Sequence, residues 1–141
     1  MAFVVDASMA LSWHFPDEET AATAALFDRT VTEPIVVPGH WQAELANGAL
    51  VGERRGRTNS AQTSNLVGRL AIMMIEVDRH GADCALDIVL PLARAHRLTI
   101  YDAIYLELAE RRGLPLATLG VELAAAARSI GVQVLGKAEE Q

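Results

Sequence analysis

Two patterns of apolar residues alternate along the chain. Short runs rich in β-branched and other apolar residues, bounded by proline, glycine or charged residues, predict buried strands at 2–6 (AFVVD), 33–39 (EPIVVPG), 115–119 (PLATL) and 132–135 (VQVL), with an edge strand at 74–78 (MIEVD). Longer segments with helical spacing and capping residues predict helices at 8–13, from Pro16 onward, 40–55, from Thr58 or Asn59 to about Met73, 82–96, 99–112 and 120–130.

This alternation of strand and helix predicts one α/β domain over residues 1–141. Its strands are short and apolar on both faces, as strands of a buried parallel sheet are. We therefore expect a three-layer sandwich, with helices on both sides of a mostly parallel sheet. Ligands of such sheets bind beyond the carboxyl ends of the strands. Asp6, Asp78 and Gly120 each follow a predicted strand at that edge.

Composition narrows the class of protein. The net charge of −6, from 12 basic and 18 acidic residues, argues against a protein that coats nucleic acid, but not against a nuclease whose acids hold metal ions. No run reaches the roughly 20 apolar residues of a membrane span, and the N-terminus lacks the pattern of a signal peptide. A single cysteine, Cys84, excludes an internal disulfide and suits the cytoplasm.

Three carboxylates are candidates for chemistry, and each has a structural alternative. Asp6 directly follows an apolar strand, where it is either a helix cap or a functional acid. Glu44 and Asn47 share one helix face, either as a solvated stripe or as a partly buried polar pair. Asp102 has capping-box spacing with Thr99, and the same residue could cap the helix and bind a metal.

Other polar residues favour structural roles. Asp78, His80 and Asp83 surround Gly81, which we expect to break the chain, and they form either a solvated turn or a metal loop. Cys84 is expected to pack as a small apolar residue, and Glu107 with Arg111 to form a surface ion pair. The sequence has no nucleophile elbow, P-loop or dinucleotide-binding turn, so any catalysis must use carboxylates.

Three segments taken together resemble those of PIN-domain ribonucleases, most closely the VapC-type toxins of bacterial toxin–antitoxin pairs. They are VVDASMALSWHFPDE, PGHWQAELANGAL and LTIYDAIYLELAERRGLPLATL, which occur in that order and span most of the chain. The resemblance implies a PIN-like fold and an acidic site. That site would consist of Asp6, Glu44 and Asp102, accompanied by the polar residues Ser8, Asn47 and Thr118.

One position departs from the family pattern. The family usually carries a further aspartate where this chain has Gly120. Glu122 follows shortly after, but on a helix we expect it to point elsewhere. The resemblance also argues against a catalytic role for Asp78, since the family site does not use that strand end.

The resemblance implies an endoribonuclease that depends on Mg²⁺ or Mn²⁺ and leaves a 5′-phosphate and a 3′-hydroxyl. Asp6, Asp102 and Glu44 would be the metal ligands. It also implies a homodimer and a small cognate antitoxin that covers the site. Apolar residues at 20–29 and 59–73 are candidates for these two interfaces. The basic cluster Arg54, Arg55 and Arg57 is either a set of RNA contacts or an ordinary solvated helix end.

Two other classes of function compete with the nuclease. Gly120 favours a catalytically weakened or inactive PIN-fold module whose role is to pair with an antitoxin. A receiver-like phosphoacceptor also gathers acids at strand ends, but it needs a lysine after a late strand. The only lysine, Lys137, lies past the final predicted strand.

Overall fold

A parallel sheet of five strands forms the centre of the computed structural model, which describes residues 1–136. The strand order is β3-β2-β1-β4-β5, and every pairing is parallel. The strands are β1 (Phe3–Val5), β2 (Ile35–Pro38), β3 (Ile75–Asp78), β4 (Leu116–Ala117) and β5 (Val134–Leu135). The predicted α/β class, with a mostly parallel sheet, is confirmed, and β3 is an edge strand as expected.

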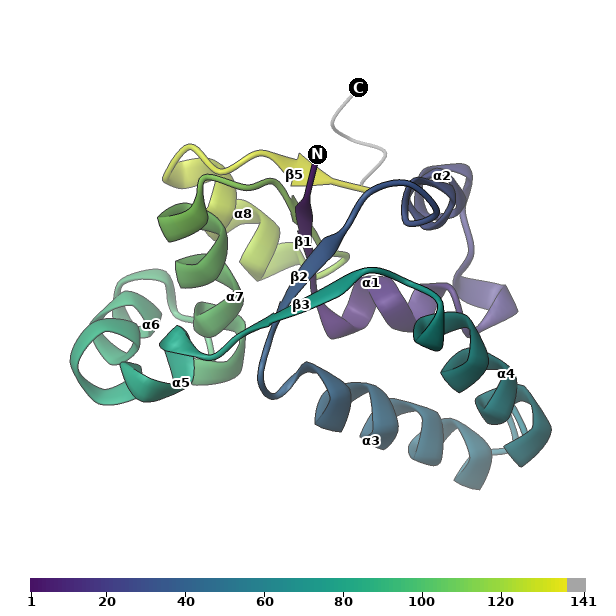
Figure 1. The fold of residues 1–141 in the computed structure, drawn as a ribbon. Coiled ribbons are helices and arrows are strands. Elements are labelled where there is room, and N and C mark those ends of the chain that lie inside the picture. Colours follow the sequence, from purple (N-terminus) through teal and green to yellow (C-terminus); the bar gives the residue numbers. More distant parts are fainter. Residues whose placement is uncertain (137–141) are drawn as a thin grey trace.

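Helices cover both faces of the sheet. In Figure 1, α1 to α4 lie on one side and α5 to α8 on the other. Their bounds are α1 (Ala7–Ser12), α2 (Ala21–Arg29), α3 (Trp41–Arg54), α4 (Ser60–Ala71), α5 (His80–Asp83), α6 (Leu90–His96), α7 (Ile100–Arg112) and α8 (Val121–Ser129). The helix α7 packs on β1, β2 and β4, and its residues 103–109 are all buried.

The segment after Pro16 is not the start of one long helix. Pro16–Glu18 forms a single 3-10 turn, and α2 begins separately at Ala21. Thr20 has an extended backbone, and its hydroxyl accepts the Thr23 N–H while the Thr23 hydroxyl accepts the Thr20 N–H. This reciprocal capping box starts a new helix and so ends the turn before it.

The segment 82–96 is helical as predicted, but it is divided and is not one continuous helix. The chain forms α5, a π-helical segment at Ala85–Val89, and then α6. Pro91 in the first turn of α6 has no N–H to continue the preceding ladder, so the helix restarts there. Gly81 lies inside α5 rather than breaking the chain. A Cβ atom at Gly81 would lie 2.8 Å from Ile104 Cγ2, so the glycine allows α5 to approach α7 closely.

The parallel arrangement decides where the site lies. Because all strands point the same way, Asp6 after β1, Thr118 after β4 and the start of α3 after β2 reach the same edge of the sheet. The chain runs outward from β1 through β2 to β3 and then crosses to β4 on the other side of β1. The strand order therefore reverses between β1 and β4, which creates a crevice at this edge. No helix within residues 1–136 combines the length and apolar character needed to span a membrane.

Candidate active site

Asp6 is a buried carboxylate in the crevice between β1 and β4, with an exposed fraction of 5%. Its Oδ1 atom accepts hydrogen bonds from the Met9 N–H at 2.9 Å and from the Ser8 hydroxyl at 2.7 Å. The Thr118 hydroxyl donates to Oδ2. Asp6 therefore caps α1, and it is also bound from the far side of the crevice, which a cap alone does not require.

The turn after β4 is tied to the same carboxylate. The Gly120 N–H donates to Thr118 Oγ1 at 3.0 Å, and the Leu119 N–H donates to Ser8 Oγ at 3.0 Å. Ser8 and Thr118 each link Asp6 to this turn, so two of the three predicted supporting residues contact the Asp6 carboxylate directly. The network fixes the start of α8 relative to β1.

Burial raises the pKa of Asp6 to about 6, although hydrogen bonds from Thr118, Met9 and Ser8 act in the opposite direction. The negative charge of Asp102 adds a smaller increase. At neutral pH the group is ionised at a cost in free energy. An anion held at such a cost is one that a bound cation would stabilise.

Glu44 lies on α3 and is held by two aromatic side chains. The Tyr105 hydroxyl donates to Glu44 Oε1 at 2.6 Å, and His40 Nε2 lies 3.2 Å from the same oxygen. Burial raises the pKa of Glu44, but His40 and Tyr105 outweigh it, so the net shift is downward. Glu44 is therefore a half-buried functional candidate rather than part of a solvated stripe, whereas Asn47 is exposed.

His40 and Tyr105 were not singled out from the sequence. His40 precedes Glu44 by one helical turn, and Tyr105 follows Asp102 by three residues on α7. This i,i+3 and i,i+4 spacing to two candidate acids is the signal that would have found them. Burial, and then the bond to Glu44, raise the pKa of Tyr105, so its hydroxyl remains a donor to Glu44 at neutral pH.

Asp102 lies in the first turn of α7. Its N–H donates to Thr99 Oγ1 at 3.1 Å, so Thr99 caps the helix. Within residues 1–136 the Asp102 carboxyl makes no hydrogen bond back to Thr99, so only half of the expected capping box forms. Burial raises the pKa of Asp102, and the charges of Glu44 and Glu122 raise it further. Glu122 is exposed and acts on Asp102 only through its charge.

Gly120 has an ordinary backbone conformation, with φ of −70° and ψ of 125°, which any L-residue adopts. A Cβ atom there would lie 3.4 Å from Thr118 Oγ1 and 3.7 Å from Leu123 Cβ. Neither the backbone nor the space around it requires glycine. The fold would therefore accept an aspartate at position 120. Glycine there removes a carboxylate from the site without a structural need for glycine.

The donor set fits a divalent cation by its chemistry. Asp6, Glu44 and Asp102 offer carboxylate oxygens, which Mg²⁺ and Mn²⁺ prefer, and their mutual repulsion would be relieved by a cation. Within residues 1–136, no three acidic, histidine or cysteine side chains already have a metal-binding arrangement. The three acids interact electrostatically. Their convergence on one ion stays a prediction.

The three arginines near the end of α3 differ from one another. Arg57 donates to Asp17 at 3.0 Å and to Glu18 at 2.8 Å, and its guanidinium lies 3.9 Å from the centre of the Phe15 ring. It is thus held in place by other side chains. Arg54 and Arg55 are exposed and form no ion pair within the described part of the chain.

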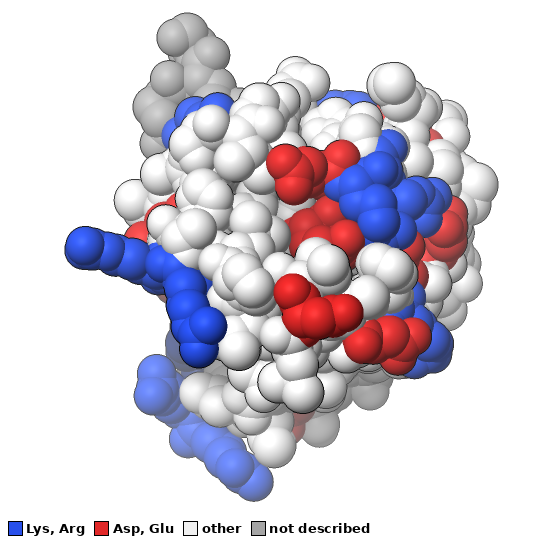
Figure 2. Space-filling model, turned by 90° about the vertical axis from the view of Figure 1, so that its left-hand side faces the viewer, with Lys and Arg blue, Asp and Glu red and all other residues white. Residues whose placement is uncertain are grey.

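A separate ionic network stands at the end of β3. Asp78 accepts bonds from Arg111 at 2.7 Å and from Arg112 at 3.3 Å, and Arg111 also binds Glu107 at 2.7 Å. Glu107 is only 6% exposed, so its pair with Arg111 is not the surface pair expected. Figure 2 shows acidic and basic side chains side by side on the face at the left of Figure 1. These arginines neutralise Asp78 and so favour a structural role.

The remaining residues of the turn after β3 also bind one another. The His80 N–H donates to Asp78 Oδ1 at 3.1 Å, which is the geometry of a local turn. Cys84 was expected to pack as a small apolar residue; it is half-buried, and its Sγ lies 3.4 Å from His80 Nε2.

A family profile and a related sequence both point to PIN-domain proteins. The sequence profile described as PIN domain matches residues 3–129. Ribonuclease VapC3 from Pyrobaculum aerophilum is 30% identical over 125 residues, which cover 88% of this chain and 93% of that protein.

Solved structures have the same fold. The crystal structure of PAE2754 from Pyrobaculum aerophilum superimposes with a TM-score of 0.66 at 27% identity, covering 95% of this chain and 92% of the other. FitAcB from Neisseria gonorrhoeae gives a TM-score of 0.61 at 19% identity, with 96% of both chains covered, and shows the fold alone. Because the PIN domain profile covers residues 3–129 and a relative is 30% identical over 88% of the chain, this chain belongs to the PIN domain family.

Proposed function

We propose that this protein is a metal-dependent RNA endonuclease and the toxin of a toxin–antitoxin pair. The single observation that carries the proposal is Asp6. It is a buried carboxylate between two parallel strands, and its pKa is raised mainly by burial and to a smaller extent by the charge of a second acid, Asp102. Proteins keep such groups where a cation or a reacting phosphate uses them. The similarity to Ribonuclease VapC3 supports RNA as the substrate. That substrate and the lone thiol Cys84 fit a cytoplasmic protein.

In this proposal the three acids bind the metal ion, and the neighbouring hydroxyl groups orient them. Asp6 and Asp102 would hold Mg²⁺ or Mn²⁺, with Glu44 binding directly or through water. When bound, such an ion lowers the pKa of a water molecule and stabilises charge on the phosphate. Ser8 and Thr118 orient the Asp6 carboxylate.

Tyr105 orients Glu44 through its hydrogen bond, and Tyr105 with the nearby His40 lowers the pKa of Glu44, so the carboxyl is ionised at neutral pH. An ionised Glu44 can accept a hydrogen bond from water next to the scissile phosphate and so orient that water for attack. Hydrolysis of this kind would leave a 5′-phosphate and a 3′-hydroxyl.

Cleavage of RNA by the purified chain tests the proposal. We expect cleavage with Mg²⁺ or Mn²⁺ and none with EDTA, and end-labelling should show a 5′-phosphate on the product. Asp6→Ala and Asp102→Ala should lower the rate at least about a hundredfold, the scale expected for removing a group that stabilises transition-state charge. Asp28→Ala, which changes an exposed aspartate on α2, is the matched control.

Full activity of Asp6→Ala would refute the assignment of the site. A wild-type chain that binds an antitoxin but cuts no RNA with either metal would favour the alternative, an inactive PIN-fold module. Gly120 is the feature that keeps this alternative open.

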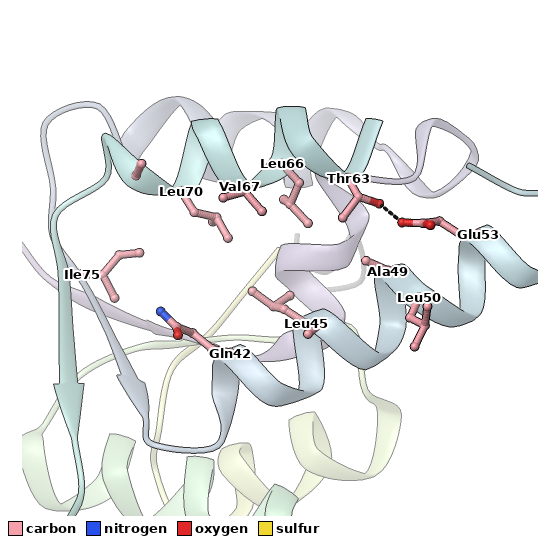
Figure 3. A pocket seen from close by; sticks show the side chains of 12 residues that line it. Gln42, Leu45, Ala49, Leu50, Glu53, Thr63, Leu66, Val67, Leu70 and Ile75 are labelled. Atoms are coloured by element: carbon pink, nitrogen blue, oxygen red, sulfur yellow. Dashed lines mark hydrogen bonds between the residues drawn. The ribbon is translucent and has the colours of Figure 1, made fainter. Parts of the chain in front are cut away.

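An apolar groove between α3 and α4 is the surface we assign to the antitoxin. It has a volume of about 560 Å³ and is lined mainly by apolar side chains, including Leu45, Ala49, Leu66, Val67 and Leu70. Figure 3 shows these side chains pointing into it, with Thr63 bonded to Glu53 at 2.6 Å near one end. Such a groove suits the apolar face of an amphipathic helix. Of the two segments predicted to line it, only the one at 59–73 does.

The product of a small neighbouring reading frame is the probe for this groove. Val67→Asp places a charge in the groove at a side chain that is already 61% exposed, and it should abolish co-purification. Ile88→Asp, at a residue 50% exposed and outside the groove lining, should leave binding intact. Equal binding by both variants would contradict the assignment.

A homodimer is the second assembly that we propose. The apolar side chains of Val31 and Ile72, which follow α2 and α4 on one side of the sheet, are 78% and 85% exposed in the single chain. An interface on that side would bury them against a second copy. Light scattering that gives a monomer mass at high protein concentration would contradict the dimer.

A further inference from the structure

A second groove runs between α1 and α3 and begins at the acidic site. Ser8, which binds Asp6, lines it together with Asn47. Arg55 and Arg57 also line it, and the half-buried side chain of Val51 lies between Asn47 and Arg55 along α3. The volume is about 350 Å³. This groove therefore joins the proposed catalytic acids to the basic end of α3.

The lining of the groove is more basic than the chain as a whole. The protein has a net charge of −6, yet Arg55 has no acidic partner within residues 1–136. Glu18, the acidic residue in the lining, is paired with Arg57 at 2.8 Å. Arg57 also binds Asp17, which lies outside the lining. The lining itself thus carries one more basic than acidic side chain. Arg55 is the basic side chain without an acidic partner in the described residues, about 12 Å from Asn47 at the helical rise of about 1.5 Å per residue.

The apolar part of the groove suits a flat ring. Leu11 from α1 and Val51 from α3 both line it. The Arg57 guanidinium, fixed over the Phe15 ring at 3.9 Å, adds a rigid planar wall. A volume of about 350 Å³ is near the lower end for ligand pockets, at about 300 Å³, and suits a base but not a duplex.

We propose that this groove binds the single-stranded segment of RNA next to the scissile phosphate. Arg55 contacts a phosphate, Leu11 and Val51 pack against a base, and Asn47 binds its polar edge. Single strands present their bases to side chains, whereas a duplex hides them in its stack. The inference rests on the proposed function for its substrate, and it assigns to Arg55 the role that the sequence left among three arginines.

Binding of a fluorescein-labelled ten-nucleotide RNA in EDTA tests the groove without cleavage. For Arg55→Ala, the slope of log K against log salt should become shallower by about 0.7, the value for one phosphate contact on a single strand. Val51→Trp fills the groove and should weaken binding about tenfold with an unchanged slope. Arg94→Ala, which changes an exposed arginine on α6, should change neither. Duplex RNA of the same sequence should bind more weakly than the single strand to the wild type.

Two results would overturn the proposal. One is a wild-type salt slope for Arg55→Ala, and the other is duplex binding that equals single-strand binding and is insensitive to Val51→Trp. Thermal melting of each variant verifies its fold, and if Val51→Trp does not fold, the slope for Arg55→Ala still decides. RNA that binds as expected but is not cut when metal is added would refute the nuclease and leave the groove supported.

Discussion

The substitution Asp6→Asn in the metal-free protein tests whether ionisation of the buried Asp6 carboxyl destabilises the fold at neutral pH. The carboxyl is 5% exposed, and burial raises its pKa from 3.8 to about 6. A raised pKa means that the folded state binds the proton more tightly than the unfolded state does. Asp6 therefore contributes stability below about pH 4 that is lost as the pH rises through about 6.

The magnitude follows from the two pKa values. The rise from 3.8 to about 6 corresponds to about 3 kcal/mol, at about 1.36 kcal/mol for each pH unit. Asn cannot ionise, so it avoids this cost at neutral pH. Asn also replaces the carboxylate oxygen that accepts the Thr118 hydroxyl. We expect that loss to shift the stability of Asp6→Asn by the same amount at every pH. At pH 4 the unfolded carboxyl is already more than half ionised, so part of this difference is lost there. We therefore expect the free energy of unfolding of Asp6→Asn, minus that of the wild type, to increase by about 2.4 kcal/mol between pH 4 and pH 7.

Urea unfolding at a series of pH values, followed by the fluorescence of the buried residues Trp13 and Trp41, gives this difference. The comparison cancels other titrating groups that the two proteins share, such as His14, whose pKa is lowered by burial and by Arg69. Asp28→Asn, at an exposed aspartate on α2, is the control. A difference that stays constant from pH 4 to pH 7 would refute the reasoning.

Three further changes test other parts of the site. Gly120→Asp should fold normally, because φ is −70°, and it should bind Mn²⁺ more tightly in calorimetry; unchanged affinity would show that no ligand is missing there. Tyr105→Phe removes the donor 2.6 Å from Glu44 and should lower cleavage or metal affinity by about 1.5–3 kcal/mol, while retained activity would exclude a positioning role. Arg111→Met leaves buried Glu107 unpaired and should lower the free energy of unfolding by about 3 kcal/mol, so an unchanged urea midpoint would contradict the pairing.

Much of the local structure was predictable from the sequence. Short apolar runs between prolines and charged residues marked the strands, and capping residues marked the starts of several helices. Asn59, for example, caps α4 as expected. Asp6 and Asp102 could be recognised as candidates because each lies at the boundary of an element, and boundaries are set by nearby residues. The resemblance to the family then added Glu44, which the pattern alone left undecided.

Tertiary structure decided which distant groups meet. Tyr105 binds Glu44 across 61 residues of sequence, and Thr118 binds Asp6 across 112. Gly81 serves close packing on Ile104 rather than a chain break, Glu107 is buried rather than exposed, and Arg57 is held by Asp17, Glu18 and Phe15. Periodicity fixes which face of an element is apolar, because it depends only on neighbours in the chain. The partner of a polar group depends on packing between elements, and that packing sets the burial and the charges that determine its pKa.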